Sequence, residues 1–285
     1  MRTSLSQGEL SFSGITGHRF GLSSKKWQRL SGVTALVTGA GTGYGQAISI
    51  ALSCAGASVI LVGRRREKLE DTAAKCLDFG SVPSAPNVRP FDLCNVEKIT
   101  GFLTDLEHDF GAISLLVNNA ALPCKRTGMN ELPLFSYDSG SWETMFTTNV
   151  TAPWLLSREV ITRFQDSSSI RILNMTSRAG WASQGGVGPY NVSKAALNNL
   201  TMSMAEEARM QFPNSDIQIN ALNPWEARTE MNPHSDNKAE AVIQMALLLL
   251  AQSAGGPSGY FFCRDGGHHP FNDAPAYEKD LASEA

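Results

Sequence analysis

The chain has 285 residues, of which 42% are hydrophobic and 18% are charged, and its formal net charge is -3. This length and composition are typical of a folded globular protein and exclude a disordered chain or a mini-protein held together by disulfides. Because 24 basic residues are offset by 27 acidic ones, we expect no nucleic-acid partner, and no apolar run reaches the ~20 residues that a membrane-spanning helix needs.

The cysteines and histidines give no sign of a disulfide framework or a metal site. The five cysteines are widely spaced and include no C-x-x-C pair, which is typical of free thiols in a reducing compartment. His268 and His269 are adjacent, but no spacing places two imidazoles on one helix face beside a third ligand. We expect no bound metal.

Residues 1–31 differ in composition from the rest of the chain. They contain seven serines and five Lys or Arg, with Glu9 as the single acid. A flexible arm and an organellar transit peptide share this composition. We therefore expect an N-terminal extension on a cytoplasmic protein, or on a protein of an organelle matrix if the segment is a targeting signal.

From Val33 onward, short β-branched runs alternate with longer helical stretches, the pattern of repeated βαβ units. The expected strands cover 33–37, 58–62, 87–91, 115–117, 170–175, 217–222 and 259–263, and the expected helices cover 46–55, 65–77, 96–110, 142–164, 190–211 and 237–250. Asn237 and Glu240 suggest a capping box for the last helix. The prediction is α/β: one doubly wound, Rossmann-type parallel sheet over 32–267, followed by a polar tail over 268–285.

The first expected strand leads directly into Thr38-Gly-Ala-Gly-Thr-Gly-Tyr-Gly45 and then into a helix. Gly39 allows a tight turn, Gly43 lets the backbone approach a pyrophosphate, and Gly45 permits close helix packing. The N–H groups of the helix N-terminus are free to bind the anion. We assign the whole turn to cofactor binding, Thr38 and Tyr44 included.

The end of the second strand indicates which dinucleotide binds. An acid there would bind the 2′-hydroxyl of NAD, and a base would accept the 2′-phosphate of NADP. The sequence is Val62-Gly63-Arg64, which lacks the acid and places Arg64 to make charge-assisted bonds to a phosphate. NADP(H) is therefore the expected cofactor; the alternative is that the arginines are only the solvated start of a helix.

Tyr190 and Lys194 lie four residues apart on one face of an expected helix, and Ser177 lies thirteen residues upstream, just after a strand. Reduction of a ketone builds negative charge on the carbonyl oxygen, so a positioned acid must donate a proton. A phenol with a pKa of ~10 is too weak an acid unless its surroundings change. The positive charge of Lys194 would lower the pKa of Tyr190, and Ser177 would hydrogen-bond the developing oxyanion.

Together, the T-G-x-x-x-G-x-G turn and the S...Y-x-x-x-K arrangement resemble the short-chain dehydrogenase/reductase family, over residues 33 to about 267. The resemblance implies that Lys194 also holds the nicotinamide ribose, and that Asn149 is a fourth catalytic residue, which orders a water between Lys194 and solvent. It also implies cofactor roles for Asp92 at the adenine, for Asn118 in an N-N-A-A version of the N-N-A-G motif, and for Thr229 near the nicotinamide.

Three features depart from the family pattern. Ala121 replaces the last Gly of N-N-A-G, a mild change if its φ is negative. Trp225 replaces the Gly after Pro224, and its ring would cover the nicotinamide, line the substrate pocket or pack in the core. Only seven residues separate Thr229 from Asn237, which predicts an open pocket without a long lid.

These observations predict an NADPH-dependent carbonyl reductase or alcohol dehydrogenase that acts on a small-molecule ketone or secondary alcohol, with Tyr190 as general acid and base. It resembles the carbonyl-reductase and tropinone-reductase-like members, and family analogy implies a homodimer or homotetramer. One alternative is a 3-oxoacyl carrier-protein reductase, in which Lys125 or Arg126 contacts an acidic carrier. Another is a catalytically idle NADPH sensor. Cys124 is either a reactive thiol at the substrate entrance or an inert one.

Overall fold

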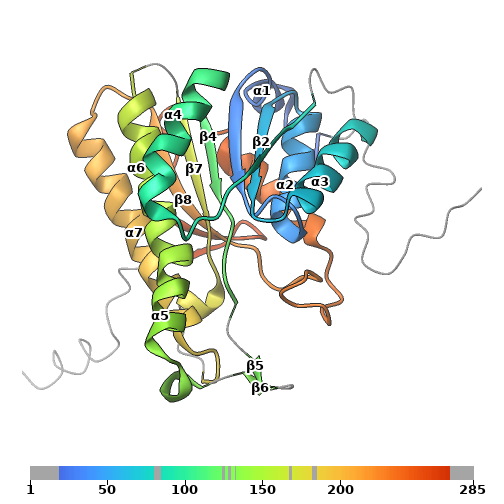
Figure 1. The fold of residues 1–285 in the computed structure, drawn as a ribbon. Helices are drawn as coiled ribbons and strands as arrows, with labels where there is room; N and C mark the ends of the chain where they lie inside the picture. The colour runs from blue at the N-terminus through green and yellow to red at the C-terminus, as the bar shows by residue number, and fades with distance from the viewer. Residues whose placement is uncertain are drawn as a thin grey trace, which may run out of the picture.

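A single eight-stranded sheet forms the centre of the computed structural model, which describes residues 19–79, 85–123, 126–127, 130–131, 133–166, 169–181 and 185–269. The strand order is β10-β9-β8-β7-β4-β1-β2-β3, and all strands except β10 run parallel (Figure 1). The bounds are β1 (Thr34–Thr38), β2 (Ser58–Gly63), β3 (Asn87–Pro90), β4 (Leu115–Asn118), β7 (Ile170–Met175), β8 (Ile217–Asn223), β9 (Phe261–Cys263) and β10 (His268–His269). The predicted doubly wound α/β fold is confirmed.

Helices cover both faces of this sheet (Figure 1). The helices α2 (Gly43–Cys54), α3 (Arg66–Asp78) and α8 (Ile243–Leu250) pack on one face, and α4 (Ile99–Phe110), α6 (Ala152–Phe164) and α7 (Pro189–Gln211) pack on the other. Two shorter helices are α1 (Ser24–Gln28) and α5 (Ser139–Phe146), and a small hairpin consists of β5 (Arg126–Thr127) and β6 (Asn130–Glu131).

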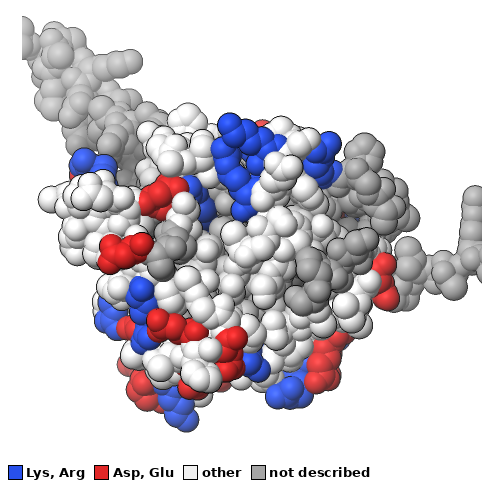
Figure 2. Space-filling model, turned by 90° about the horizontal axis from the view of Figure 1, so that it is seen from above, with Lys and Arg blue, Asp and Glu red and all other residues white. Residues whose placement is uncertain are grey.

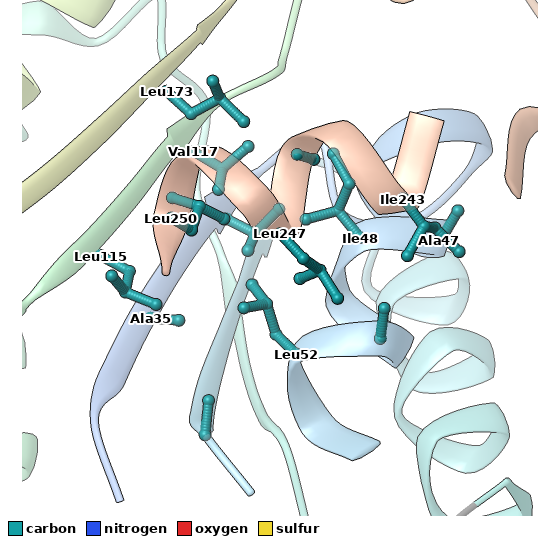
Figure 3. Packing of buried hydrophobic residues seen from close by; sticks show 14 of the residues in the cluster. Ala35, Ala47, Ile48, Leu52, Leu115, Val117, Leu173, Ile243, Leu247 and Leu250 are labelled. Atoms are coloured by element: carbon teal, nitrogen blue, oxygen red, sulfur yellow. The ribbon is translucent and has the colours of Figure 1, made fainter. Parts of the chain in front are cut away.

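Alternate residues of the central strands enter two different cores. In β1, Ala35 and Val37 belong to the cluster on the α2 and α8 side, whereas Leu36 belongs to the cluster on the α4 and α6 side. Successive side chains of a strand point to opposite faces, so a strand buried on both faces reads as a continuous apolar run. Figure 3 shows the first cluster, where the strand residues Ala35, Leu115, Val117 and Leu173 meet Ala47, Ile48, Leu52, Ile243, Leu247 and Leu250.

Two expected helices differ from the prediction. The helix expected over 142–164 is interrupted by a π-helical turn, Thr147–Thr151, between α5 and α6. The helix expected over 237–250 begins instead with a 3-10 turn, Ala239–Val242, whose N-cap is Lys238, so the predicted capping box is wrong. The reason is that the Asn237 carbonyl accepts a hydrogen bond from the Arg228 N–H (2.7 Å), which keeps Asn237 in the preceding segment.

Parts of both expected terminal segments are folded. Leu22 and Leu30 from the N-terminal extension are buried in the core on the α2 side, with α1 between them. At the other end, His268–His269 pairs antiparallel with β9 as the eighth strand, so the sheet includes the start of the expected tail. The remainder of both segments, 1–18 and 270–285, lies outside the described residues.

The face seen from above carries both basic and acidic side chains, in several places next to each other, with much uncharged surface between them (Figure 2). No described helix is long and apolar enough to cross a membrane. Within the described ranges, no His, Cys, Asp and Glu residues cluster in a way that could hold a metal ion. The four described cysteines, Cys54, Cys76, Cys94 and Cys263, are free thiols.

Candidate active site

A cleft of about 510 Å³ lies at the carboxyl ends of the parallel strands, the edge from which the β4 connection descends in Figure 1. Ligands of doubly wound sheets bind in this crevice. Its walls come from the glycine turn after β1, the start of α3, the loops after β3 and β4, and residues 229–231. Of the predicted cofactor residues, those lining the cleft are Gly39, Gly43, Tyr44, Arg64, Asp92 and Thr229.

The glycine turn fits a phosphate-binding cradle. Gly39 has a φ of +63° and Gly43 a φ of +56°, which only glycine adopts easily. A Cβ on Gly43 would lie 3.0 Å from the Thr229 methyl carbon, and one on Gly45 would lie 2.3 Å from the Gly39 carbonyl oxygen. Thr42 does not cap α2 with its side chain, so the first N–H groups of α2 are free to bind the pyrophosphate of a dinucleotide.

Thr38 and Asn118 are buried beside the cleft and do not line it. The Thr38 hydroxyl accepts hydrogen bonds from the N–H groups of Asn119 (3.0 Å) and Ala120 (3.1 Å). The Asn118 side-chain amide donates to Asn174 Oδ1 (2.8 Å). Thr38 therefore supports the loop after β4, and Asn118 connects β4 with β7. The neighbouring Asn119, which sequence reasoning missed, lines the cleft.

The far end of the cleft is basic and exposed. Arg64, Arg65 and Lys68 line it together. Arg65 forms a two-pronged ion pair with Glu230, at 2.6 and 3.2 Å, and this pair lowers the pKa of the Glu230 carboxyl. Arg64 has no ion-pair partner within the part of the chain that the structure describes. The short segment after Thr229 was expected to leave the pocket open; instead its Glu230 reaches across to the start of α3.

The loop after β3 forms another wall of the cleft. Asp92 lines the cleft beside Phe91 and Leu93, and its Oδ1 accepts a hydrogen bond from the Cys94 N–H (3.0 Å). Ala121, the departure from N-N-A-G, also lines the cleft and does not have a positive φ.

At the other end of the site, Lys194 is held beside Tyr190. Lys194 is 3% exposed, and its Nζ donates a hydrogen bond to the Met175 carbonyl oxygen (2.8 Å) at the end of β7. Nζ lies 5.7 Å from the centroid of the Tyr190 ring. Burial lowers the pKa of Lys194 to about 8. The four-residue spacing on α7 thus brings a phenol and a poised ammonium together.

The turn that carries Ser177 packs directly on α7. Ser177 follows β7 and begins a 3-10 turn, Arg178–Gly180, where its hydroxyl accepts the Ala179 N–H (3.1 Å). A Cβ on Gly180 would lie 2.5 Å from the carbonyl carbon of Lys194, so only glycine allows this contact. The contact fixes Ser177 at the same end of the sheet as Lys194.

Asn149 connects the loop after β4 with α7. It is fully buried in the π-helical turn, and its Oδ1 accepts the Leu122 N–H (2.8 Å). Its side-chain amide donates to the Leu122 carbonyl (3.2 Å) and to Ser193 Oγ (3.1 Å), and Ser193 in turn donates to the Tyr190 carbonyl (2.7 Å). Sequence reasoning missed Ser193, although it stands within the Y-N-V-S-K segment.

Trp225 keeps the backbone conformation of the glycine that it replaces, with a φ of +57°. Its side chain is 44% exposed, which rules out packing in the core. The Tyr44 hydroxyl donates to its carbonyl oxygen (2.6 Å), and the Arg264 guanidinium lies over its ring, 5.1 Å from the centroid. Sequence reasoning also missed Arg264, because no motif includes it.

The remaining sequence hypotheses concern the segment between β4 and α5. Cys124 and Lys125 lie outside the described residues, and of Arg126 only the backbone is described, in β5. The structure therefore does not test the roles suggested for these side chains at a substrate entrance or a carrier interface.

The sequence is similar to known proteins over most of its length. The model of the short chain dehydrogenase family matches residues 33–240. Gluconate 5-dehydrogenase of Gluconobacter oxydans is 31% identical over 202 residues, 71% of this chain and 74% of that protein. Nodulation protein G of Rhizobium sp. is 31% identical over 219 residues, 76% of this chain and 82% of that protein.

Solved structures agree with the sequence matches. A short-chain dehydrogenase from Pseudomonas syringae superposes with a TM-score of 0.74 at 27% identity, covering 83% of this chain and 96% of that one. A metagenomic short-chain oxidoreductase in complex with NADP gives a TM-score of 0.68 at 27% identity, with coverage of 80% and 95%. With the glycine cradle, the Tyr190–Lys194 pair and these matches in agreement, the chain belongs to the short-chain dehydrogenase/reductase family of oxidoreductases.

Proposed function

We propose that this protein reversibly reduces a ketone to a secondary alcohol with NADP(H), using Tyr190 as the general acid and base, as in the carbonyl reductases of the family. The observation that carries the proposal is the buried Lys194 ammonium, 5.7 Å from the Tyr190 ring. Tyr190 and Lys194 are not among the residues that line the cleft of about 510 Å³, but Asn149 is bonded to Leu122, which does line it. The gluconate dehydrogenase among the relatives supports an alcohol or ketone as the substrate class.

When bound, the nicotinamide supplies the hydride for reduction or accepts it in oxidation. The Tyr190 hydroxyl donates a proton to the carbonyl oxygen during reduction and takes it back during oxidation. Because the Met175 carbonyl holds Lys194 in place, its positive charge stays beside Tyr190 and favours the phenolate. Ser177 donates a hydrogen bond to the oxygen on which negative charge develops.

Proton return to Tyr190 involves Asn149. Its Oδ1 accepts one hydrogen bond, from Leu122, so its second lone pair can hold a water that connects Lys194 with solvent. Asn149 also fixes the first turn of α7 through Ser193, which holds Tyr190 in position.

The preference for NADP(H) rests on the basic end of the cleft. Gly63 provides no carboxylate to bind a ribose hydroxyl, and the unpaired Arg64 lines the cleft next to Lys68. A 2′-phosphate bound there would gain charge-assisted hydrogen bonds. The metagenomic relative with NADP bound supports the same assignment.

Titration of the purified protein with NADPH and with NADH, followed by NADPH consumption on ketones, diketones, quinones and acyl thioesters, tests the proposal. We expect tighter binding of NADPH and turnover of at least one ketone, which Tyr190→Phe should slow by ~10²-fold or more. Equal affinity for both dinucleotides would contradict the cofactor assignment. Near-normal turnover by Tyr190→Phe would contradict the assigned acid and base.

We also propose that two copies pair through α5, α6 and α7. Large apolar side chains are exposed on these helices: Trp142 is 37% exposed, Trp154 is 40% exposed and Val192 is 37% exposed. The mass in solution at micromolar concentration checks this. A dimer or tetramer is expected, and a strict monomer would contradict the proposal.

A further inference from the structure

Arg264, the first residue after β9, carries a charge that no described carboxylate neutralises. Its Nη1 is buried and has no hydrogen-bond partner, and no ion pair to it is found in the described part of the chain. Its side-chain contact is with the Trp225 ring, 5.1 Å away. A buried donor left without an acceptor costs free energy, so such a group in a native protein calls for an explanation.

The backbone fixes Arg264 and Trp225 at the same point of the sheet. Both are tied to Asn223, the last residue of β8: the Arg264 N–H donates to its carbonyl (3.0 Å), and the Trp225 N–H donates to its Oδ1 (3.1 Å). The hydroxyl of Tyr44, a residue lining the cofactor cleft, holds the Trp225 carbonyl. The backbones of Arg264 and Trp225 are therefore fixed by the end of β8 and by Tyr44 of α2, and the guanidinium lies over the Trp225 ring.

Ring contacts also place Arg264 on the side of the sheet where the Ser177 turn lies. Trp181, the residue after that turn, packs against Phe261 of β9, with ring centroids 5.6 Å apart. The same turn packs on the Lys194 backbone through Gly180. Arg264 directly follows β9, so it belongs to the elements that adjoin the predicted catalytic residues.

We propose that Arg264 binds a carboxylate of the substrate, so that the enzyme acts on oxo acids and the corresponding hydroxy acids, with Trp225 supporting the guanidinium. A guanidinium offers parallel N–H donors that match the two oxygens of a carboxylate. A single guanidinium carries one positive charge, which matches one carboxylate better than a doubly charged phosphate. This inference rests on the proposed function, since it assigns the substrate of that same site.

The first test uses substrates that differ only in charge: 4-oxopentanoate, 5-oxohexanoate and 6-oxoheptanoate, each beside its methyl ester. With NADPH, we expect at least one acid to exceed its ester in kcat/KM by about tenfold or more. Arg264→Met should bring this ratio close to one, and Arg264→Lys should leave an intermediate ratio because it keeps the charge without the planar fork. Arg209→Met, which removes an exposed arginine on α7, should keep the wild-type ratio. Thermal melting of each variant checks that it is folded.

The second test measures binding without turnover. The complex of Tyr190→Phe with NADPH is titrated with the same acids and esters, and binding is followed by NADPH fluorescence. The inference is supported if the complex binds an acid more tightly than its ester and Arg264→Met removes this preference. If the wild type binds in this way and turns over none of these compounds, the proposed function fails and the inference about Arg264 stands. Equal binding or turnover of acids and esters overturns the inference and leaves the proposed function intact. A preference for dihydroxyacetone phosphate over every acid also overturns it, in favour of a phosphate site.

Discussion

The two ends of the site are built in different ways. At the reaction end, which holds the predicted catalytic residues, Lys194 and Asn149 are buried and bonded to backbone groups, the Met175 carbonyl and both backbone polar groups of Leu122. At the opposite end, the Arg65–Glu230 ion pair is exposed, and Arg64 has no ion-pair partner among the described residues. Under the proposed function, the side chains for proton transfer are therefore held by the protein itself, whereas those at the basic end are held mainly by contacts with the ligand.

Because the two ends differ in burial, substitutions at each end should have different effects. Changes at the buried end should alter rate and stability and should depend little on salt. Changes at the exposed end should alter dinucleotide affinity and should weaken as salt screens the charges. Four substitutions test whether the two ends of the site respond in these different ways.

Tyr190→Phe should lower kcat by ~10²-fold or more, because it removes the proton donor and leaves the ring. NADPH affinity should change far less, since Tyr190 lies at the reaction end. Single-turnover rates and a fluorescence titration measure the two quantities. Tyr260→Phe, at an exposed tyrosine next to β9, serves as the matched control. A variant that loses affinity and keeps its rate would reverse the assignment of the two ends.

Lys194→Met should change how stability depends on pH. Burial lowers the pKa of Lys194 from 10.5 to about 8, so the unfolded chain binds this proton more tightly than the folded one. The contribution of Lys194 to stability therefore rises as pH increases from about 8 to about 10.5. Relative to Lys194→Met, the unfolding free energy of the cofactor-free wild type should increase across this window by at most about 3 kcal/mol. Urea unfolding at several pH values measures it, and a constant difference would show that Lys194 is not buried as described.

Arg64→Ala should weaken NADPH binding by ~10- to 100-fold, the loss expected for charge-assisted bonds worth about 1.5 to 3 kcal/mol. NADH binding should change little, because NADH has no 2′-phosphate. Titrations at low and high salt measure both affinities, and the NADPH effect should shrink at high salt. Arg66→Ala is the control, since Arg66 is exposed near Glu70 on α3. Equal losses for both dinucleotides would refute phosphate recognition by Arg64.

Glu230→Gln should strengthen NADPH binding at low salt by less than about fivefold, since an exposed ion pair is worth at most about 1 kcal/mol. The substitution frees Arg65, which lines the same end of the cleft, to contact the ligand. Glu206→Gln breaks a comparable exposed pair on α7 and should have no effect on affinity. Weaker NADPH binding in Glu230→Gln would mean that the ion pair helps to shape the site instead of competing for Arg65.

Sequence alone could predict the features that depend on local spacing. The alternation of apolar runs predicts the parallel sheet, because strands buried on both faces have no polar face. The four-residue spacing of Tyr190 and Lys194 predicts their shared helix face, and the position of Ser177 after a strand predicts its edge of the sheet. These features depend on residues that are close together in the chain, so the sequence alone can predict them.

Contacts between distant segments could not be read in this way. Arg65 and Glu230 are 165 residues apart, and no motif relates them. Arg264 meets Trp225 because β8 and β9 pair: Trp225 lies just after Asn223, the last residue of β8, and Arg264 follows Cys263, the residue of β9 that is opposite Asn223. The capping box at Asn237 was wrong for the same reason: its carbonyl is bonded to Arg228 across a short loop, which local propensity does not reveal.

The π-helical turn around Asn149 has a consequence for changes in chain length. A π turn accommodates one residue more than the α-helix on either side of it, and such turns persist mainly at functional sites. Deleting Val150 would let α5 and α6 join into one regular helix. It would also rotate the two halves of this helix relative to each other by about 100°. Asn149 could then no longer face both Leu122 and Ser193. A change of one residue in the length of this helix would therefore break the contacts that hold Asn149 in its proposed place in proton return.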